Sequence, residues 1–168
     1  GSEAVYLLVG IEYNKAVWRR TWPVIMENVI TACRAHGSKL VFMDNVYPYG
    51  LVEGPMTEET PMRPCSEKGK IRMATDRMLL DAMDSGLRAC IARSADFYGP
   101  NCRTSGLNIT VFDRYAAGKS ATLLGRADKV HTYSYVPDLG PALAILGTDA
   151  RADGQVWHHG SFMLTGLA

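Results

Sequence analysis

The sequence predicts an α/β fold in three layers, with a parallel sheet covered by helices on both faces. Apolar runs of strand length, such as Ala4–Gly10 and Leu87–Arg93, alternate with longer segments of helical periodicity. These runs are nearly continuous and do not alternate with polar residues, which is typical of strands buried on both faces. Together, the two observations predict strands joined by crossover helices.

The first three elements are expected to be a strand, a helix and a strand. The first strand is Ala4–Gly10. Apolar residues then recur with helical spacing from Val24 onward, which predicts a helix. Pro23 suits the first turn of that helix, and Gly37 is expected to end it. Lys39–Asn45 is the second strand, which completes a strand–helix–strand unit.

The second half of the chain continues the same alternation after a turn-rich stretch. Prolines and glycines fill Pro48–Pro64, a helix is expected from Ser66 to Gly86, and a third strand spans Leu87–Ala92. We expect the three strands to be adjacent in chain order and parallel. The remaining expected elements are a loop at 94–106, a helix at 107–117, a strand at 121–125, a helix at 137–146 that carries Asp138 near its start, and a last strand at 154–160.

The composition is that of an ordinary globular domain, and we expect one partial domain over residues 1–168. Hydrophobic residues make up 47% of the chain, charged residues 21%, and the formal net charge is +1. There is no basic block, no apolar run long enough to span a bilayer and no secretory leader, so we expect neither nucleic acid nor membrane as a partner. Four cysteines without a C-x-x-C pair indicate reduced thiols in a cytoplasmic protein.

Two short motifs are better explained as structural features than as functional sites. The sequence AAGKS, at 116–120, ends like a phosphate-binding loop, but Asp113 stands where that loop needs glycine, and the motif follows a helix. No G-x-G-x-x-G occurs in the chain. His158 and His159 are neighbours on a strand and point to opposite faces, so we expect no metal there.

Lys68 and Arg72 attract attention because they lie four residues apart at the start of a helix. At this spacing both side chains share one helix face. One interpretation is a solvated basic stripe that includes Lys70. The other is a functional pair, and two neighbouring positive charges would suit a small anion.

Five segments together resemble a known family. In chain order they are VYLLVG, NVITACRAHGSKLVFMDNVYPYG, MTEETPMRPCSEKGKIR, ARSADFYGP and HTYSYVPDLGPALAIL. The sequence resembles the extended short-chain dehydrogenase/reductases, the NAD-dependent epimerase/dehydratase group. The resemblance implies a Rossmann-like fold, with NAD(P) as cofactor. Relative to that family the chain is expected to start at the fourth strand, so that it lacks the N-terminal dinucleotide-binding half and a complete C-terminal lobe.

The resemblance also assigns site residues. The family's catalytic Ser or Thr matches Asn45, and its Tyr and Lys match Lys68 and Arg72, so all three positions are substituted. Three residues on the loop of Asn45 could take over the role of the missing catalytic groups: Asp44, Tyr47 and Tyr49. The family's cofactor-binding positions match Val9, Gly10, Ser94 and Asp96. We expect that NAD(P) is not bound by this chain alone.

Two hypotheses about function follow from the substitutions. The first is a truncated or degenerate epimerase/dehydratase without the usual hydride transfer, because the Tyr that exchanges a proton with the substrate hydroxyl is missing. The alternative is a non-enzymatic binding or oligomerisation module with a small-anion pocket at Lys68 and Arg72. In the family fold, a first strand lies beside the strand that matches Ala4–Gly10. Without that neighbour the apolar strand Ala4–Gly10 would lie at a sheet edge, so we expect a second copy or another chain to cover it.

Overall fold

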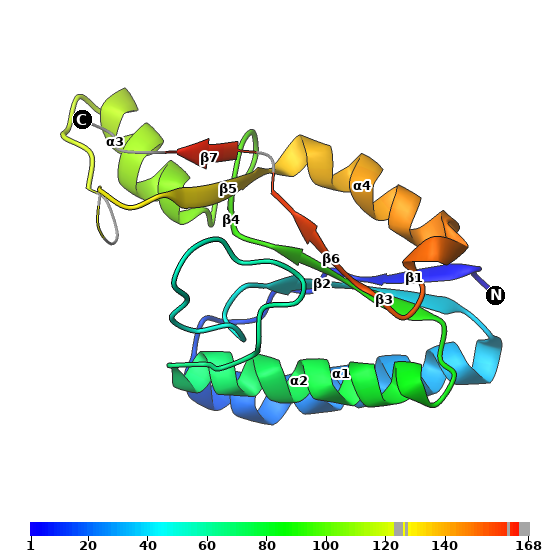
Figure 1. Cartoon of the computed structure of the whole chain (residues 1–168). Helices are drawn as coiled ribbons and strands as arrows, with labels where there is room; N and C mark the ends of the chain where they lie inside the picture. Colours follow the sequence, from blue (N-terminus) through cyan, green and yellow to red (C-terminus); the bar gives the residue numbers. More distant parts are fainter. Residues whose placement is uncertain (123–125, 127, 161, 165–168) are drawn as a thin grey trace. The chain divides into compact units, whose positions relative to one another are not determined.

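The computed structural model describes residues 1–122, 126, 128–160 and 162–164, and the chain divides into two compact units. One unit comprises Gly1–Arg93 with Leu143–His158, and the other comprises Ser94–Ala142 with His159–Ala168. Figure 1 shows the elements in chain order. The expectation of one domain over residues 1–168 stays a prediction.

The first unit contains a sheet of four strands in the order β1-β2-β3-β6. These are β1 (Ala4–Leu7), β2 (Lys39–Asn45), β3 (Ala89–Ser94) and β6 (Val156–His159). Strands β1 and β2 are parallel, with Ala4 opposite Lys39. The expected strand order is therefore confirmed. However, β1 ends at Leu7, three residues earlier than expected.

Helix α1 (Lys15–His36) begins earlier than the sequence pattern indicated. Asn14 caps it, because its side-chain Oδ1 accepts the backbone N–H of Ala16 at 2.8 Å. Pro23 therefore lies inside the helix, and the expectation that it occupies the first turn was wrong. Apolar residues at helical spacing upstream and downstream of Pro23 are buried, and their packing outweighs the hydrogen bond that a proline cannot donate: Trp18, Trp22, Met26, Ile30 and Cys33.

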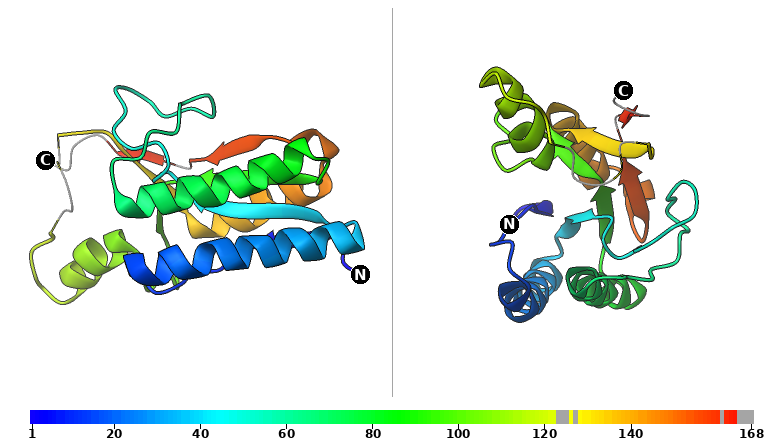
Figure 2. Two further views of the ribbon diagram at one scale, coloured as in Figure 1. Left: turned by 90° about the horizontal axis from the view of Figure 1, so that it is seen from below. Right: turned by 90° about the vertical axis from the view of Figure 1, so that its left-hand side faces the viewer.

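Helix α2 (Glu67–Asp84) confirms the helix expected from Ser66. The Ser66 hydroxyl accepts the N–H of Gly69 at 3.0 Å, which is a normal N-cap. Helices α1 and α2 run side by side along one face of the sheet (Figure 2). The turn-rich stretch between β2 and α2 forms no regular element apart from a bridge between Gly50 and Arg63.

The period-two alternation of strand side chains creates the layers of this unit. Leu40 and Phe42 of β2 pack in the cluster that α1 and α2 cover. Val41, between them, belongs to a second cluster with Leu143 of helix α4 (Val136–Thr148) and Ala152 of the short 3₁₀ helix η2 (Ala150–Ala152). Both faces of the sheet are thus covered, as the continuous apolar runs predicted.

The second unit contains a small sheet that the sequence did not reveal. Strand β5 (His131–Tyr135) lies between β4 (Asp96–Tyr98), to which it is parallel, and β7 (Phe162–Leu164), to which it is antiparallel. The expected loop across Asp96–Tyr98 is therefore partly wrong, because a three-residue strand is too short to leave a pattern. The strand expected at 121–125 falls largely outside the described residues.

The helix expected at 107–117 is present, but it has two parts. A π-helical segment η1 (Asn108–Phe112) continues into α3 (Asp113–Ala116). AAGKS follows this helix, as expected, and Gly118 adopts a left-handed conformation with φ of 69° in the turn that ends it.

Candidate functional site

Four buried charges meet where β2 ends. Asp44 of β2 receives Arg72 Nε of α2 on Oδ1, at 2.7 Å, and Arg93 Nε of β3 on Oδ2, at 3.1 Å. Arg93 also donates through Nη2 to Asp76 of α2 at 2.6 Å. All four side chains are at most 3% exposed. Two carboxyl groups and two guanidinium groups are therefore paired with one another inside the fold.

Arg72 is part of the core of this unit. Its guanidinium carbon lies 4.0 Å from the centroid of the Trp22 ring and 4.9 Å from that of Phe42. Stacked on aromatic rings and paired with Asp44, the group has no open face for an external anion. This arrangement does not support a small-anion pocket shared by Lys68 and Arg72.

The pKa values of the network follow from burial and neighbouring charge. Burial, together with repulsion from Asp44, raises the pKa of Asp76 well above its usual range, although Arg93 acts against this shift. Burial alone would lower the pKa of Arg93, but the charges of Asp76 and Asp44 raise it overall. The two carboxyl groups therefore favour the charged form of Arg93.

Lys68 lies apart from this network and is held by an aromatic side chain. Its Nζ is 2.8 Å from the centroid of the Tyr13 ring and donates to the Tyr13 carbonyl oxygen at 3.2 Å. The Tyr13 hydroxyl lies 3.2 Å from the hydroxyl of Tyr47, whose ring stacks on Trp18. The structure thus brings Lys68 and Tyr47 together through Tyr13, which the sequence reasoning missed because Tyr13 lies 55 residues before Lys68.

Asn45 and Tyr49 make other contacts. Asn45 Oδ1 accepts the backbone N–H of Tyr47 at 3.0 Å, so the amide shapes its own loop. Tyr49 is only 1% exposed, and its hydroxyl lies 2.5 Å from His158 Nε2, so it does not face solvent. The catalytic roles that the resemblance gave to Asn45, Lys68, Arg72, Asp44 and Tyr47 stay predictions.

The cofactor positions implied by the resemblance are spread over both units. Val9 and Gly10 are exposed residues beyond the end of β1. In the second unit, Ser94 is buried with no hydrogen-bond partner for its hydroxyl among the described residues, and Asp96 pairs with His131 at 3.0 Å.

The N-termini of α1 and α2 do not provide a pyrophosphate-binding turn. Pyrophosphate binding needs free backbone N–H groups in a glycine-rich turn at a helix N-terminus. The chain has no such glycine motif, and Asn14 and Ser66 already accept N–H groups at the first turns of α1 and α2.

A cavity of about 570 Å³ lies at the opposite end of β2, beside Lys39 and Arg88. Lys39 is buried there, and its Nζ contacts the Asp153 carboxylate at 2.5 Å and the Asp149 carbonyl at 2.8 Å. Its charge is therefore neutralised within the fold, and this cavity shares no residue with the candidate site.

The described residues contain neither a metal-binding cluster nor a membrane-spanning helix. Among residues 1–122, 126, 128–160 and 162–164, no three His, Cys, Asp or Glu side chains gather where they could hold a metal ion. Within the same residues, no helix is long and apolar enough to cross a membrane. The four cysteines are free, and Cys33 and Cys90 are buried.

The fold defines the class of protein as Rossmann-like. The structure matches dTDP-glucose 4,6-dehydratase from Bacillus anthracis, solved with NAD, with a TM-score of 0.83 at 20% identity over 98% of this chain and 54% of that one. It also matches UDP-glucuronic acid 4-epimerase from Bacillus cereus, solved with NAD, with a TM-score of 0.81 at 17% identity over 96% and 55%.

The family model of the NAD dependent epimerase/dehydratase family matches residues 4–158, and the chain belongs to this family. A comparison with curated proteins found no match. The chain spans about half the length of the solved structures that it resembles.

Proposed function

We propose that this chain is part of an epimerase/dehydratase-type domain in which the usual hydride-transfer chemistry is absent. The main support is that Arg72, which the resemblance matches to the family's lysine, is buried against Asp44 and Trp22. A guanidinium held in this way is not placed to tune a neighbouring acid or base.

The other half of the family pair supports the same proposal. By the resemblance, Lys68 stands where other members of the family have a tyrosine. That tyrosine takes the substrate's hydroxyl proton while hydride passes to NAD. Here Lys68 donates to the Tyr13 carbonyl and lies on the Tyr13 ring. The phenol on which the family's proton transfer depends is therefore absent from this position, and the lysine that stands there is held by Tyr13.

The second part of the proposal concerns which part of the family fold this chain matches. We propose that the matched half lacks the dinucleotide-binding strands, so that NAD(P) is not held by this chain alone. The absence of a glycine-rich turn and the capped helix N-termini support this.

We also propose that another polypeptide, either a second copy or a different chain, covers β1. Among the described residues this strand has a neighbour on one side, which places its other row of backbone groups at the sheet edge. Tyr6, Leu8 and Val9 on or just beyond this strand are 38%, 55% and 44% exposed. Apolar side chains beside an open strand edge favour association.

Turnover assays test the proposed loss of chemistry. The chain is incubated with NAD or NADP and a panel of nucleotide sugars, including UDP-glucose, dTDP-glucose and UDP-glucuronic acid, while cofactor reduction and sugar products are followed. We expect no reaction above the rate without protein. Lys68→Ala and the matched variant Lys70→Ala serve as controls, because Lys70 is an exposed neighbour that pairs with Glu67 at 2.8 Å. Turnover that Lys68→Ala abolishes and Lys70→Ala retains would contradict the proposal and show a rebuilt site.

A further inference from the structure

The ladder between β1 and β2 shows which backbone groups of β1 lie at the open edge of the sheet. The N–H of Lys39 in β2 donates to the carbonyl oxygen of Glu3 at 2.9 Å, and Lys39 lies opposite Ala4. In a parallel ladder every second residue bonds to the same neighbour, so Glu3, Val5 and Leu7 face β2. The N–H and C=O groups of the residues between and after them therefore point to the open edge: Ala4, Tyr6 and Leu8.

The opposite edge of the same sheet is protected in a way that β1 is not. Strand β6 forms that edge, and the backbone N–H of His158 in β6 donates to Glu58 Oε1 at 2.8 Å, so a side chain of the same chain occupies an edge donor. From Ala4 to Ile11 the sequence contains no charged residue and no proline. Strand β1 therefore lacks the charges and prolines that usually prevent a strand edge from pairing.

Two copies of this edge are complementary only when they run antiparallel. In a parallel ladder the bonding residues of the two strands are staggered by one position, as Lys39 lies opposite Ala4 but bonds to Glu3. A two-fold axis along the strands would instead place each N–H against the same N–H of the other copy. An axis perpendicular to the sheet makes the strands antiparallel, and opposite residues then exchange both hydrogen bonds in a closed dimer.

We propose that β1 pairs with β1 of a second copy in an antiparallel ladder whose two-fold axis passes beside Tyr6. This inference names the partner in the proposal that another polypeptide covers β1, and it rests on that proposal. Tyr6 then lies opposite its own copy and Ala4 lies opposite Leu8, so all the outward-facing groups exchange hydrogen bonds. Moving the axis one residue toward the N-terminus would place Leu8 opposite Ser2, whose carbonyl oxygen already accepts the Ser38 hydroxyl at 2.6 Å.

The side chains at this edge also suit a second copy. Val5 and Leu7 pack in the core cluster that α1 and α2 cover, so the residues between and after them project from the opposite face of the sheet. Tyr6 and Leu8 are 38% and 55% exposed there. In the proposed ladder Tyr6 stands beside its own copy and Leu8 covers Ala4, and such aromatic and apolar cross-strand pairs stabilise a sheet.

Disulfide cross-linking of the full chain tests this register. One cysteine at a time is placed at the edge in a Cys65→Ser, Cys102→Ser background, because these two native cysteines are not buried. In Tyr6→Cys the two Cα atoms of the dimer would lie about 5.5 Å apart, which is within the range of a disulfide. We expect mild oxidation at micromolar concentration to convert most of this variant into a covalent dimer.

Ala4→Cys is the matched control. Its two copies would lie about 13 Å apart along the ladder, too far for a disulfide. Alone it should stay without a cross-link, whereas an equimolar mixture of Ala4→Cys and Leu8→Cys should give the mixed disulfide, which peptide mass spectrometry identifies. This mixture retains Tyr6, so it decides the register if Tyr6→Cys does not fold.

The outcomes separate this inference from the proposal on which it rests. A wild-type chain that light scattering finds to be monomeric would contradict both the coverage of β1 and its self-pairing. If the wild type associates, but Tyr6→Cys cross-links no more than Ala4→Cys and the mixture gives no mixed disulfide, only the self-pairing of β1 is overturned.

Discussion

At the scale of single residues, two side chains that the resemblance matched to catalytic positions are held by contacts inside the fold: Arg72 by Asp44 and Lys68 by Tyr13. The resemblance matches Arg72 to a lysine of the family, and in the fold Arg72 pairs with Asp44, which the sequence analysis named as a possible replacement for a catalytic residue. In the fold Asp44 is the counter-ion of two arginines, because Arg93 of the adjacent strand reaches its second oxygen. Its charge is needed to keep Arg72 and Arg93 buried.

The first prediction concerns this counter-ion. Asp44→Asn should lower the free energy of unfolding by about 3–5 kcal/mol, because it leaves a guanidinium buried without its partner. Urea unfolding measures the loss as a lower midpoint with an unchanged slope.

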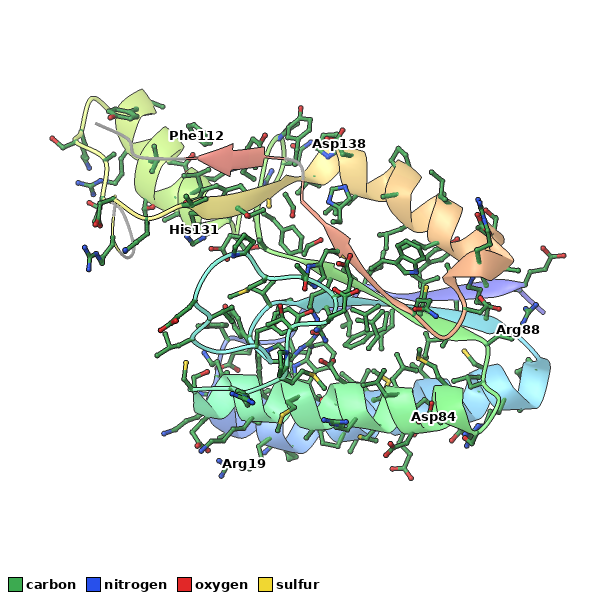
Figure 3. The ribbon with its side chains drawn as sticks, viewed as in Figure 1. Arg19, Asp84, Arg88, Phe112, His131 and Asp138 are labelled. Carbon is green, nitrogen blue, oxygen red and sulfur yellow. The ribbon has the colours of Figure 1, made fainter. Side chains whose placement is uncertain are left out.

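The control is an exposed pair on α1 and α2. Arg19 and Glu67 are 2.9 Å apart with side chains 67% and 47% exposed, and Arg19 lies on the side of the helices away from the sheet (Figure 3). Arg19→Ala should cost less than about 1 kcal/mol. An Asp44→Asn protein as stable as Arg19→Ala would contradict the role given to the network.

At the scale of elements, the first turn of α2 is closely packed against the loop that follows β2. A Cβ on Gly69 would lie 2.6 Å from the Tyr47 carbonyl oxygen and 2.9 Å from Pro64 Cβ. Neither neighbour is the flexible end of a side chain, so the contact cannot relax cheaply. This close approach holds the loop of Asn45 and Tyr47 against the helix that carries Lys68 and Arg72.

The second prediction compares two helical glycines. Gly69→Ala should destabilise the protein by about 1–3 kcal/mol through overpacking. Gly140→Ala, in α4, should stabilise it by about 0.5–1 kcal/mol, because a Cβ there meets no atom within 4 Å and alanine favours the helix. Thermal and urea unfolding measure both. Equal effects of the two changes would show that Gly69 is not confined by the loop.

At the scale of the whole molecule, the open edge of β1 is the feature with a measurable consequence. Light scattering at micromolar concentration should detect association of the wild-type chain. Leu8→Lys places a charge just beyond the strand and should shift the protein toward the monomer. Leu51→Lys is the matched control, since Leu51 is 88% exposed in the loop before α2. A monomeric wild type, or association that Leu8→Lys leaves unchanged, would contradict the proposal that another polypeptide covers β1.

Local signals determined much of the first unit. The apolar runs predicted three adjacent strands, and Ser66 and Gly37 marked helix ends correctly, because capping and left-handed turns depend on a few neighbouring residues. The start of α1 was misplaced because Pro23 is a strong local signal, whereas the burial of Trp18 and Trp22 is a tertiary effect. In the second unit, the short strands β4 and β7 carry too few residues to show a period.

The sequence by itself determined the family and the alternation of strands and helices, and it drew attention to Asn45, Lys68 and Arg72. Only the tertiary structure decided what each charge does. Arg72 pairs with Asp44, which lies 28 residues earlier in the sequence. Lys68 contacts Tyr13, which lies 55 residues earlier. A charged side chain takes its role from the partners and the solvent around it, and these come together only when distant segments pack.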